Sequence, residues 1–450
     1  MKLSPPELFL DGRVTLYSGD CIQVMKSMKE ESVHSLVSDA PYHLHSIVKR
    51  FAKAGHTDSA RTKSGPHQRT ARGFMNKQWD GGDVAFRKNT WKQAYRVIKP
   101  GGYLLAFSGT RTYHRMACAI EDAGFVVYDI VAWLYGQGFP KSVNIALEFE
   151  TTLCERREVS PGKEDWFYLG EPVQMQRVPP FRHPEAEEWY GYGTALKPSF
   201  EPVCLARKPM IGTTRENVHQ LGTGALNIDG CRIATDDEIC IGAGTSFDTI
   251  HLHEGRGQNS PFGRAAYVSV PNPGGRFPAN VVHDGSDEVV RLFPAEAGAF
   301  APVMGTEPSS AIANVYERRE RAATYFHGDA DSAGRFFYTA KAGADDRIGS
   351  THPTVKPIDL MQWLVRLVTP KGGIVLDPFA GTGTTGEAAF REGLRAVLIE
   401  REPEYQEDIR RRMALCMAGP DERRRESIKA NLKARNIPID MGPLFEGAAE

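Results

Sequence analysis

The feature that most constrains the fold of this chain is a glycine-rich turn between an apolar run and a helical segment. Residues 374–376 read Ile-Val-Leu, glycines follow at Gly381, Gly383 and Gly386, and Glu-Ala-Ala-Phe begins at residue 387. A short apolar run is typical of a buried strand, and glycine tolerates the positive φ that a tight turn needs. The pattern predicts strand, glycine loop and helix, the repeating unit of an α/β protein.

Strand-like and helix-like segments alternate through much of the chain. Apolar runs rich in β-branched and aromatic residues occur at 13–17, 33–37, 103–107 and 125–134, and helical stretches occur at 89–98 and 113–123. Residues 201–207 read as a late strand. We therefore predict an α/β, doubly wound, mostly parallel sheet with helices on both faces. At 450 residues and 41% apolar content, the chain can form two or three packed units.

Two acidic residues stand where predicted strands end. Asp377 precedes the glycine loop, and Glu400 closes the next apolar run, 396–399. A carboxylate at the mouth of the loop would repel a pyrophosphate and attract a cationic ligand. S-adenosylmethionine, with a sulfonium and an ammonium beside a ribose, fits this acid pair better than NAD, which stays the alternative. A phosphate-binding P-loop is excluded because no Gly-Lys-Ser/Thr completes the run.

A second motif lies far upstream, directly after the apolar run 33–37. Asp39, Ala40, Pro41 and Tyr42 place an acid, a constrained backbone carbonyl and an aromatic ring in succession. Pro41 biases Ala40 toward an extended conformation. At the carboxyl end of a buried strand, this set would form a pocket for a planar amine. Taken alone, the same residues are also compatible with an ordinary turn.

With both motifs in hand, the chain resembles the amino-methylating DNA methyltransferases of the β class. In that family an Asp/Asn/Ser-Pro-Pro-Tyr motif holds the base, and an Asp-x-Phe-x-Gly-x-Gly motif holds S-adenosylmethionine. The β class has the catalytic motif first, as here, and a target-recognition segment between the two. The resemblance covers about residues 12–140, 196–208 and 346–416. It implies a circularly permuted, seven-stranded, Rossmann-like sheet, with residues 201–207 and 125–134 forming an antiparallel edge at one side.

The resemblance also implies which residues hold the cofactor. Asp20 would meet the adenine, Glu400 suits the ribose hydroxyls, and His352, Thr354 and Lys356 resemble the tenth motif, which helps to hold the amino-acid end. The other cofactor residues would be Asp377, Phe379, Gly381, Gly383 and Thr384.

The catalytic set would be Asp39, Ala40, Pro41 and Tyr42. The Asp39 carboxylate and the Ala40 carbonyl would each accept one proton of adenine N6, while Tyr42 would stack on the flipped base. The family usually has proline where this chain has Ala40, but the acting group is the main-chain carbonyl, so we expect activity to survive. The acid at position 39 favours adenine, with N4 of cytosine as the alternative. Methylation at cytosine C5 needs a Pro-Cys pair, and none of the seven cysteines follows a proline.

Basic charge gathers in one segment. The net charge of −1 does not favour a nucleic-acid partner. Between residues 45 and 73, however, basic side chains outnumber the single acid, Asp58; they are Lys49, Arg50, Lys53, Arg61, Lys63, Arg69 and Arg72. This segment follows the catalytic motif, where a loop could close over double-stranded DNA beside an extruded base. RNA as substrate and a catalytically silent DNA-binding module stay open as alternatives.

The sequence further indicates a cytoplasmic protein with no metal site and no membrane span. Scattered cysteines without a Cys-x-x-Cys pair suit a reducing compartment. No apolar run reaches the length of a membrane span, and the amino terminus does not read as a signal peptide. His43 and His45 lack a third metal ligand. The resemblance is compatible with a homodimer, and with a cognate restriction nuclease that the sequence does not reveal.

The chain divides into four predicted regions. They are a catalytic half at 1–208 with an insertion at 141–195, a loop-rich target-recognition region at 209–345, a cofactor-binding half at 346–418 and a charged tail at 419–450. We expect the tail to form a solvent-exposed helix.

Overall fold

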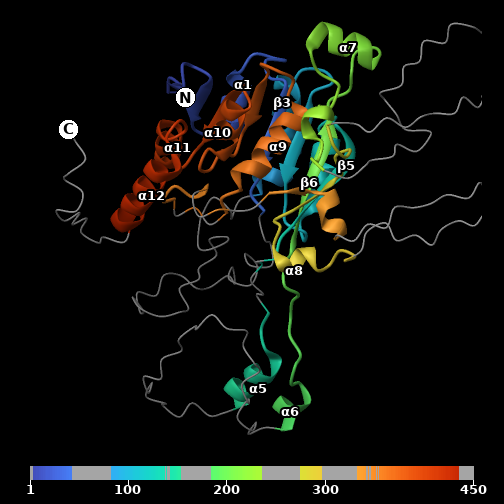
Figure 1. Ribbon diagram of the computed structural model, residues 1–450, viewed down its shortest axis with the longest axis vertical. Coiled ribbons are helices and arrows are strands. Elements are labelled where there is room, and N and C mark those ends of the chain that lie inside the picture. Colours follow the sequence, from blue (N-terminus) through green and yellow to red (C-terminus); the bar gives the residue numbers. More distant parts are fainter. Residues whose placement is uncertain are drawn as a thin grey trace, which may run out of the picture. The chain divides into compact units, whose positions relative to one another are not determined.

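The computed structural model describes residues 4–42, 83–136, 138, 142–153, 184–235, 274–295, 332–340, 343, 346–350, 352 and 354–434. The chain falls into two units, one made of Met1–Leu134 with Phe200–Glu450 and the other of Tyr135–Ser199. The larger unit carries the sheet (Figure 1).

Ten strands form a single sheet in the described part of the larger unit. Their order across the sheet is β1-β2-β10-β9-β3-β4-β6-β5-β7-β8. In chain order they are β1 (Glu7–Phe9), β2 (Val14–Ser18), β3 (Ser35–Asp39), β4 (Tyr103–Phe107), β5 (Val126–Leu134), β6 (Phe200–Arg207), β7 (Val281–His283), β8 (Tyr338–Thr339), β9 (Ile374–Asp377) and β10 (Arg395–Glu400).

The central strands, from β2 across to β5, form the predicted doubly wound sheet. β2, β10, β9, β3 and β4 run parallel, and β6 pairs antiparallel with both β4 and β5. The prediction of a mostly parallel α/β sheet is confirmed. The sheet is wider than the seven strands expected, because β1 extends one edge while β7 and β8 extend the other. These added strands have two or three residues each, too few to show a periodicity.

β3 and β9 lie side by side at the centre of the sheet, although they come from distant parts of the chain. Their paired residues are Ser35 with Val375 and Leu36 with Leu376. From this pair the chain winds outward in two directions, from β9 to β10 and from β3 to β4. The winding therefore reverses between β3 and β9. In open α/β sheets, ligands bind outside the carboxyl ends of the strands at such a switch point.

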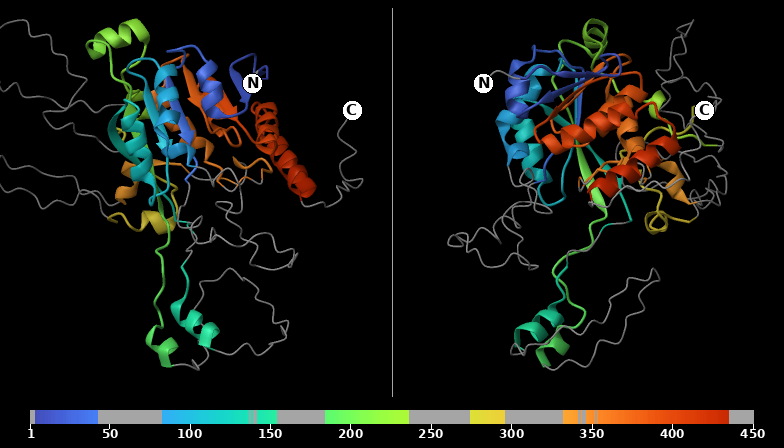
Figure 2. Two further views of the ribbon diagram at one scale, coloured as in Figure 1. Left: turned by 180° about the vertical axis from the view of Figure 1, so that it is seen from behind. Right: turned by 90° about the vertical axis from the view of Figure 1, so that its left-hand side faces the viewer.

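Helices cover both faces of the sheet (Figure 2). In one group, α3 (Lys88–Val97) contacts α1 (Cys21–Ser27) and α4 (Tyr113–Asp122). In the other group, α10 (Thr384–Arg391) contacts α9 (Ile358–Val368) and α11 (Pro403–Ala414). Every residue of β4 is buried as a result, which explains why this strand reads as a continuous apolar run.

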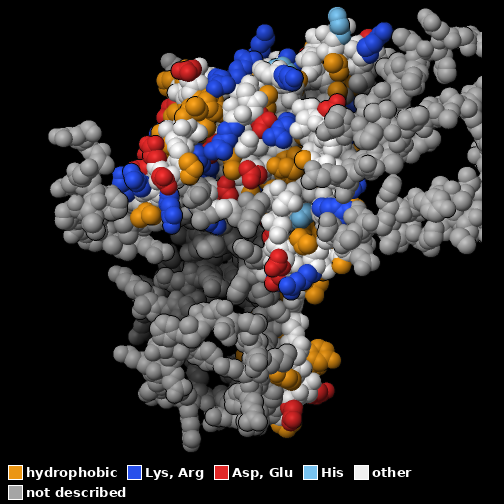
Figure 3. Space-filling model, in the orientation of Figure 1, with side chains coloured by type: hydrophobic (Ala, Val, Ile, Leu, Met, Phe, Trp, Pro, Cys, Tyr) orange, Lys and Arg blue, Asp and Glu red, His pale blue; other side chains and the backbone are white. Residues whose placement is uncertain are grey.

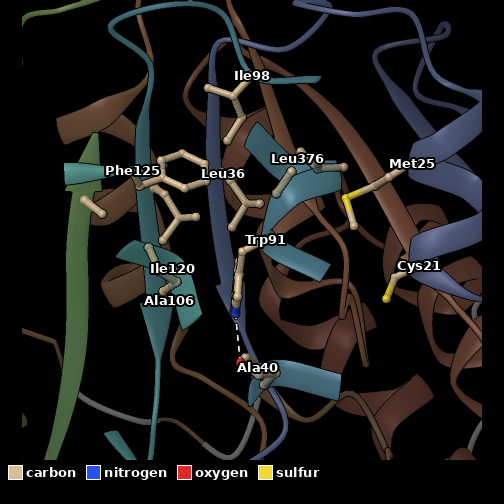
Figure 4. Packing of buried hydrophobic residues seen from close by; sticks show 14 of the residues in the cluster. Cys21, Met25, Leu36, Ala40, Trp91, Ile98, Ala106, Ile120, Phe125 and Leu376 are labelled. Atoms are coloured by element: carbon tan, nitrogen blue, oxygen red, sulfur yellow. Dashed lines mark hydrogen bonds between the residues drawn. The ribbon is translucent and has the colours of Figure 1, made fainter. Parts of the chain in front are cut away.

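The core beside the switch point is built around Trp91 on α3 (Figure 4). Trp91, Ala94 and Val97 lie at helical spacing and are fully buried. The Trp91 Nε1 donates to the Ala85 carbonyl at 2.8 Å, so burial leaves no polar atom of this ring without a partner. The ring also meets Phe379 edge-on, with centroids 6.4 Å apart. Truncating a buried tryptophan typically costs about 3–5 kcal/mol, so this packing fixes the strands that carry the site.

Further segments complete the larger unit. They are the 3-10 turns η3 (Val84–Phe86), η4 (Asp229–Cys231) and η5 (Ala333–Phe336), and the helices α7 (Thr214–Leu221), α8 (Asp287–Val290) and α12 (Pro420–Ala434). α12 lies in the predicted tail, but it is not exposed throughout, because Arg423 is only 8% exposed and pairs with Glu387. Of the helices that the structure describes, none is long and apolar enough to cross a membrane.

The smaller unit, Tyr135–Ser199, contains the predicted insertion at 141–195. Its described helices are α5 (Ile145–Leu153) and α6 (Pro184–Glu188). An antiparallel bridge joins Asn144 to Gly193. The four-region division of the chain stays a prediction.

Candidate active site

Acidic residues stand at the carboxyl ends of neighbouring parallel strands at the centre of the sheet. Glu400 ends β10, Asp377 ends β9 and Asp39 ends β3, and these strands are adjacent. At the end of β2, the Gly19 amide donates to the Glu400 carbonyl at 3.0 Å, which brings Asp20 beside these strand ends. The Asp20 side chain caps α1 by accepting from the Gln23 amide at 3.0 Å. The two sequence motifs thus meet at the switch point.

Asp377 is buried and fully engaged by its own chain. Its carboxylate accepts hydrogen bonds from the Ser38 hydroxyl and the Thr385 hydroxyl, both at 2.5 Å, and from the Phe379 amide at 3.1 Å. Burial raises the pKa of Asp377 to about 6, against the lowering effect of these donors. This side chain therefore ties β9 to β3 and to the start of α10. Direct contact of Asp377 with a cationic ligand stays a prediction.

The glycine loop has the backbone that its glycines allow. Gly381 and Gly383 have φ of +52° and +78°, in the left-handed region. A Cβ at Gly386 would lie 2.7 Å from Leu398 Cδ1, so this glycine lets α10 pack closely on β10. The neighbouring Thr384 begins α10 and is 6% exposed.

Glu400 fastens the loop from the adjacent strand. Its carboxylate oxygens accept from the Gly381 amide and the Glu402 amide, each at 2.8 Å. Burial raises the pKa of Glu400 to about 7, although these amide donors favour the charged form. This carboxyl group therefore titrates near neutrality.

The predicted tenth motif begins against the glycine loop. The His352 ring lies edge-on to Tyr405, with centroids 4.5 Å apart, and a Cβ at Gly381 would lie 3.4 Å from His352 Nε2. The Thr354 amide donates to His352 Nδ1 at 3.2 Å, which fixes the following turn. The motif then leaves the loop, because Lys356 reaches the end of β3.

Four polar side chains converge beyond the end of β3. The Lys356 ammonium lies 2.8 Å from Asp39 Oδ2, 3.1 Å from Glu201 Oε2 and 3.1 Å from the Tyr42 hydroxyl. The Tyr42 hydroxyl donates to the same Glu201 oxygen at 2.9 Å. Thr112 holds the chain here by donating to the Tyr42 carbonyl at 2.9 Å. We call Asp39, Tyr42, Glu201 and Lys356 the charged pocket.

Burial and the neighbouring charges together set the protonation of Lys356 and Tyr42. Lys356 is 5% exposed, and burial alone would lower its pKa. The carboxylates of Asp39 and Glu201 outweigh that effect and raise the pKa of Lys356 above its usual value. Burial and the same two acids raise the pKa of Tyr42, so its hydroxyl stays protonated. The rings of Tyr42, Phe107 and Trp133 also surround the ammonium, at 5.4, 5.0 and 6.0 Å from their centroids.

One acceptor of the charged pocket is unused. Asp39 Oδ1 is buried and has no hydrogen-bond partner among the described residues, while Oδ2 is held by Lys356. Buried polar atoms nearly always have a partner, and an exception calls for an explanation. Ala40, next in the chain, is 2% exposed. An amine that enters beside Asp39 would supply the missing donor.

Sequence reasoning missed Glu201 as a site residue. Residues 201–207 were expected only as an edge strand, whereas Glu201 holds both Lys356 and Tyr42. The direction of β6 could have indicated Glu201. Because β6 runs antiparallel to β4, the first residues of β6 lie beside the last residues of β4 and β3. The predicted basic cluster, Lys49 to Arg72, lies outside the described residues. Within the described ranges, no group of three or more His, Cys, Asp or Glu could hold a metal ion.

Sequence comparisons place the chain beside DNA methylases. Residues 313–411 match the profile of a family described as DNA methylase, N6_N4_Mtase. The type II methyltransferase M.HindIII of Haemophilus influenzae is 25% identical over 233 residues, which cover 47% of this chain and 64% of that protein. M2.DpnII of Streptococcus pneumoniae is 44% identical over 62 residues, 14% of this chain and 23% of that protein. The chain thus spans less than two thirds of the length of these relatives.

Solved structures with distant similarity include the M1.HpyAVI complex with SAM and the cytosine-N4-specific PvuII DNA methyltransferase. The first is 13% identical with a TM-score of 0.36 and covers 88% of this chain and 98% of its own. The second is 12% identical with a TM-score of 0.42, and covers 93% and 92%. The fold assignment rests on the strand order rather than on these superpositions. The family match over residues 313–411 confirms the resemblance that the motifs indicated: the chain is similar to the N6-adenine/N4-cytosine DNA methylases.

Proposed function

We propose that this protein is a DNA methyltransferase of the permuted β class that methylates N6 of adenine with S-adenosylmethionine as methyl donor. The observation that carries the proposal is Asp39 Oδ1, a buried acceptor with no partner in the part of the chain that the structure describes, next to Tyr42 at the switch point of the sheet. An enzyme that must grip an exocyclic amine needs such an acceptor. The family match supports the broader class of amino-methylating DNA enzymes and does not favour a nicotinamide-dependent oxidoreductase.

The residues beside the glycine loop fit S-adenosylmethionine. When bound, this cofactor supplies an electrophilic methyl group. Glu400 offers carboxylate oxygens at the end of β10, where a ribose diol could donate, and its pKa of about 7 allows the ionised form near neutrality. The acids at the ends of β9 and β3 give this edge a negative potential that favours a cation. His352, Thr354, Phe379 and Asp20 stay proposed cofactor contacts.

The charged pocket can prepare the amine for attack. Asp39 Oδ1 and the Ala40 carbonyl would each accept a hydrogen bond from one N6–H group, which directs the nitrogen lone pair toward the methyl group. Such positioning can contribute about 7–11 kcal/mol to lowering the barrier. Tyr42 would stack on the flipped base, which offsets about 1–3 kcal/mol of the cost of extruding it. No covalent bond between enzyme and base is required.

Double-stranded DNA is the proposed substrate, and the basic cluster at 49–72 is its proposed contact. On the face shown in Figure 3, the basic and acidic side chains of the described residues are interspersed rather than separated. The strong local excess of positive charge in the sequence is the 45–73 segment, directly after Tyr42. We further propose target recognition by residues 209–345, a cytoplasmic location and a homodimer. A cognate restriction nuclease is an open partner.

The test is nucleoside analysis of DNA incubated with the protein and S-adenosylmethionine. We expect N6-methyladenine. N4-methylcytosine alone would overturn the base assignment while keeping the enzyme class. Calorimetric titration provides a second check, since binding of NADH but not S-adenosylmethionine would favour the oxidoreductase. Retardation of duplex DNA without methyl incorporation would identify a catalytically silent binding module.

A further inference from the structure

Lys356 contacts the catalytic motif rather than the glycine loop. An ammonium group has three N–H donors, and three oxygens lie within hydrogen-bond distance of Lys356 Nζ. They belong to Asp39, Tyr42 and Glu201, and all three distances are 3.1 Å or less. A saturated, 5% exposed ammonium has no donor left for the amino-acid end of a cofactor. The family resemblance therefore does not account for where this lysine lies.

We propose that Lys356 is a positioning residue for Asp39. Its ammonium binds Asp39 Oδ2, balances the negative charge that Asp39 and Glu201 bring together, and leaves Oδ1 for the substrate amine. Glu201 is the anchor of this arrangement, because one of its oxygens contacts both Lys356 and Tyr42. The inference rests on the proposed function and assigns the positioning of Asp39 to Lys356 and Glu201.

The charges around Asp39 explain why a cation is needed. Glu201 approaches from β6, Asp377 from β9 and Tyr42 from the segment after β3, and none of these is cationic. Lys356 is the cation among these neighbours. Two desolvated carboxylates without a cation cannot both stay ionised, so one takes up a proton. A protonated Asp39 would lose acceptor strength toward the amine.

This reasoning predicts a specific pH effect for Lys356→Met, which keeps the length of the side chain and removes its charge. We expect the acid limb of its pH profile to move up by about one unit or more, so that kcat measured at a pH on that limb falls at least about tenfold. Turnover should recover as the pH rises. The dissociation constant for S-adenosylmethionine should stay within about threefold of the wild-type value by calorimetry.

A double variant separates this role from a purely structural one. In Lys356→Met with Glu201→Gln, both the cation and the competing acid are gone, so the repulsion between two buried carboxylates is removed. We expect the acid limb to return toward that of the wild type, although kcat remains lower. The contribution of Asp377 is common to both variants and cancels in this comparison. Lys356→Arg keeps the charge, so its acid limb should match the wild type, and this variant serves if Lys356→Met does not fold.

Three results would overturn the proposal. The first is weakened cofactor binding with unchanged kcat at saturation, which would return Lys356 to the cofactor site. The second is an equal loss in the single and double variants with an unmoved pH profile. The third is a shifted acid limb in Lys356→Arg. Wild-type protein in the same assay is the control, because absence of methyl transfer there would contradict the proposed function instead.

Discussion

The ends of β9 and β3 lie side by side, and the carboxylates at the two ends differ in how completely they are hydrogen-bonded. At the end of β9, Asp377 is satisfied by two hydroxyls and an amide of its own chain. At the end of β3, Asp39 has one oxygen held by Lys356 and one buried oxygen without a described partner. One carboxylate maintains the shape of a loop. The other is held in place with an acceptor to spare.

This difference separates a scaffold from a reacting site. A group that the chain satisfies completely gains little from a ligand, whereas an unsatisfied buried acceptor costs free energy until a donor arrives. Removing a scaffold group should therefore lower stability first and activity as a result. Removing the spare acceptor should abolish activity in a protein that still folds.

The largest expected effect is on turnover. Asp39→Ala removes the spare acceptor and should lower kcat at least about 100-fold, because both placement of the amine and proton acceptance depend on it. Cofactor affinity should change little, since Asp39 lies on β3 rather than on the glycine loop. Asp122→Ala, at an exposed position that ends α4, is the matched control. Retained turnover in Asp39→Ala would remove this residue from the mechanism.

The next effect is on stability and concerns Glu387, on the scaffold side. Glu387 is fully buried and pairs with Arg412 at 2.8 Å and with Arg423 at 2.6 Å, which joins α10 to α11 and α12. Although burial opposes it, these arginines lower the pKa of Glu387. Its contribution is therefore present above the unfolded-state pKa and is lost as the pH falls through the folded-state value.

Glu387→Gln leaves two buried guanidinium groups without their anion and should cost about 3–5 kcal/mol in the free energy of unfolding. Chemical denaturation at pH 7 measures it. Glu407→Gln is the control, because its ion pair with Arg410 has a carboxylate that is 64% exposed. Exposed pairs contribute about 0–1 kcal/mol. Equal costs for the two variants would show that the buried network does not stabilise the fold.

The apolar runs in the sequence predicted most strands of the sheet, and the two motifs predicted the site residues at the ends of β3 and β9. The central strands and the helices α3 and α4 begin and end within two residues of their predicted ranges. Partners across the pocket were not accessible in the same way. The contact of Glu201 with Lys356 depends on β6 running antiparallel beside β4, and the contact of Asp377 with Ser38 spans 339 positions. Such contacts follow from topology rather than from any local pattern.

A smaller effect is expected at Thr385, which donates to Asp377. Thr385→Val removes this hydroxyl at nearly constant volume and should cost about 1–3 kcal/mol, the usual penalty for an unsatisfied buried acceptor. The cost should grow above pH 6, because Asp377 has a pKa of about 6 and its ionised form needs the donor more. Denaturation at pH 5 and pH 8 tests this, with Thr214→Val at an exposed position of α7 as control. A cost independent of pH would contradict the stabilisation of ionised Asp377 by the Thr385 hydroxyl.

The smallest effect is a proton released when the cofactor binds. Burial raises the pKa of Glu400 to about 7, so folding alone takes up protons here, and this group's contribution to stability falls as the pH rises from about 4.5 to about 7. Hydroxyl donors of a bound ribose would favour the ionised carboxylate and lower that pKa. Binding should therefore release part of a proton near pH 7, and affinity should increase through this range.

Calorimetry in buffers of different ionisation enthalpy measures that release. Glu400→Gln should remove the release. Glu402→Gln should not, because the neighbouring Glu402 donates to Glu400 through its main-chain amide and not through its side chain. If the wild type releases no proton, Glu400 is satisfied by the Gly381 and Glu402 amides alone, as Asp377 is by its own donors. The acids beside the glycine loop would then serve only to hold the loop in shape. Among the residues that the structure describes, Asp39 Oδ1 would be the one acceptor at the switch point left for a ligand.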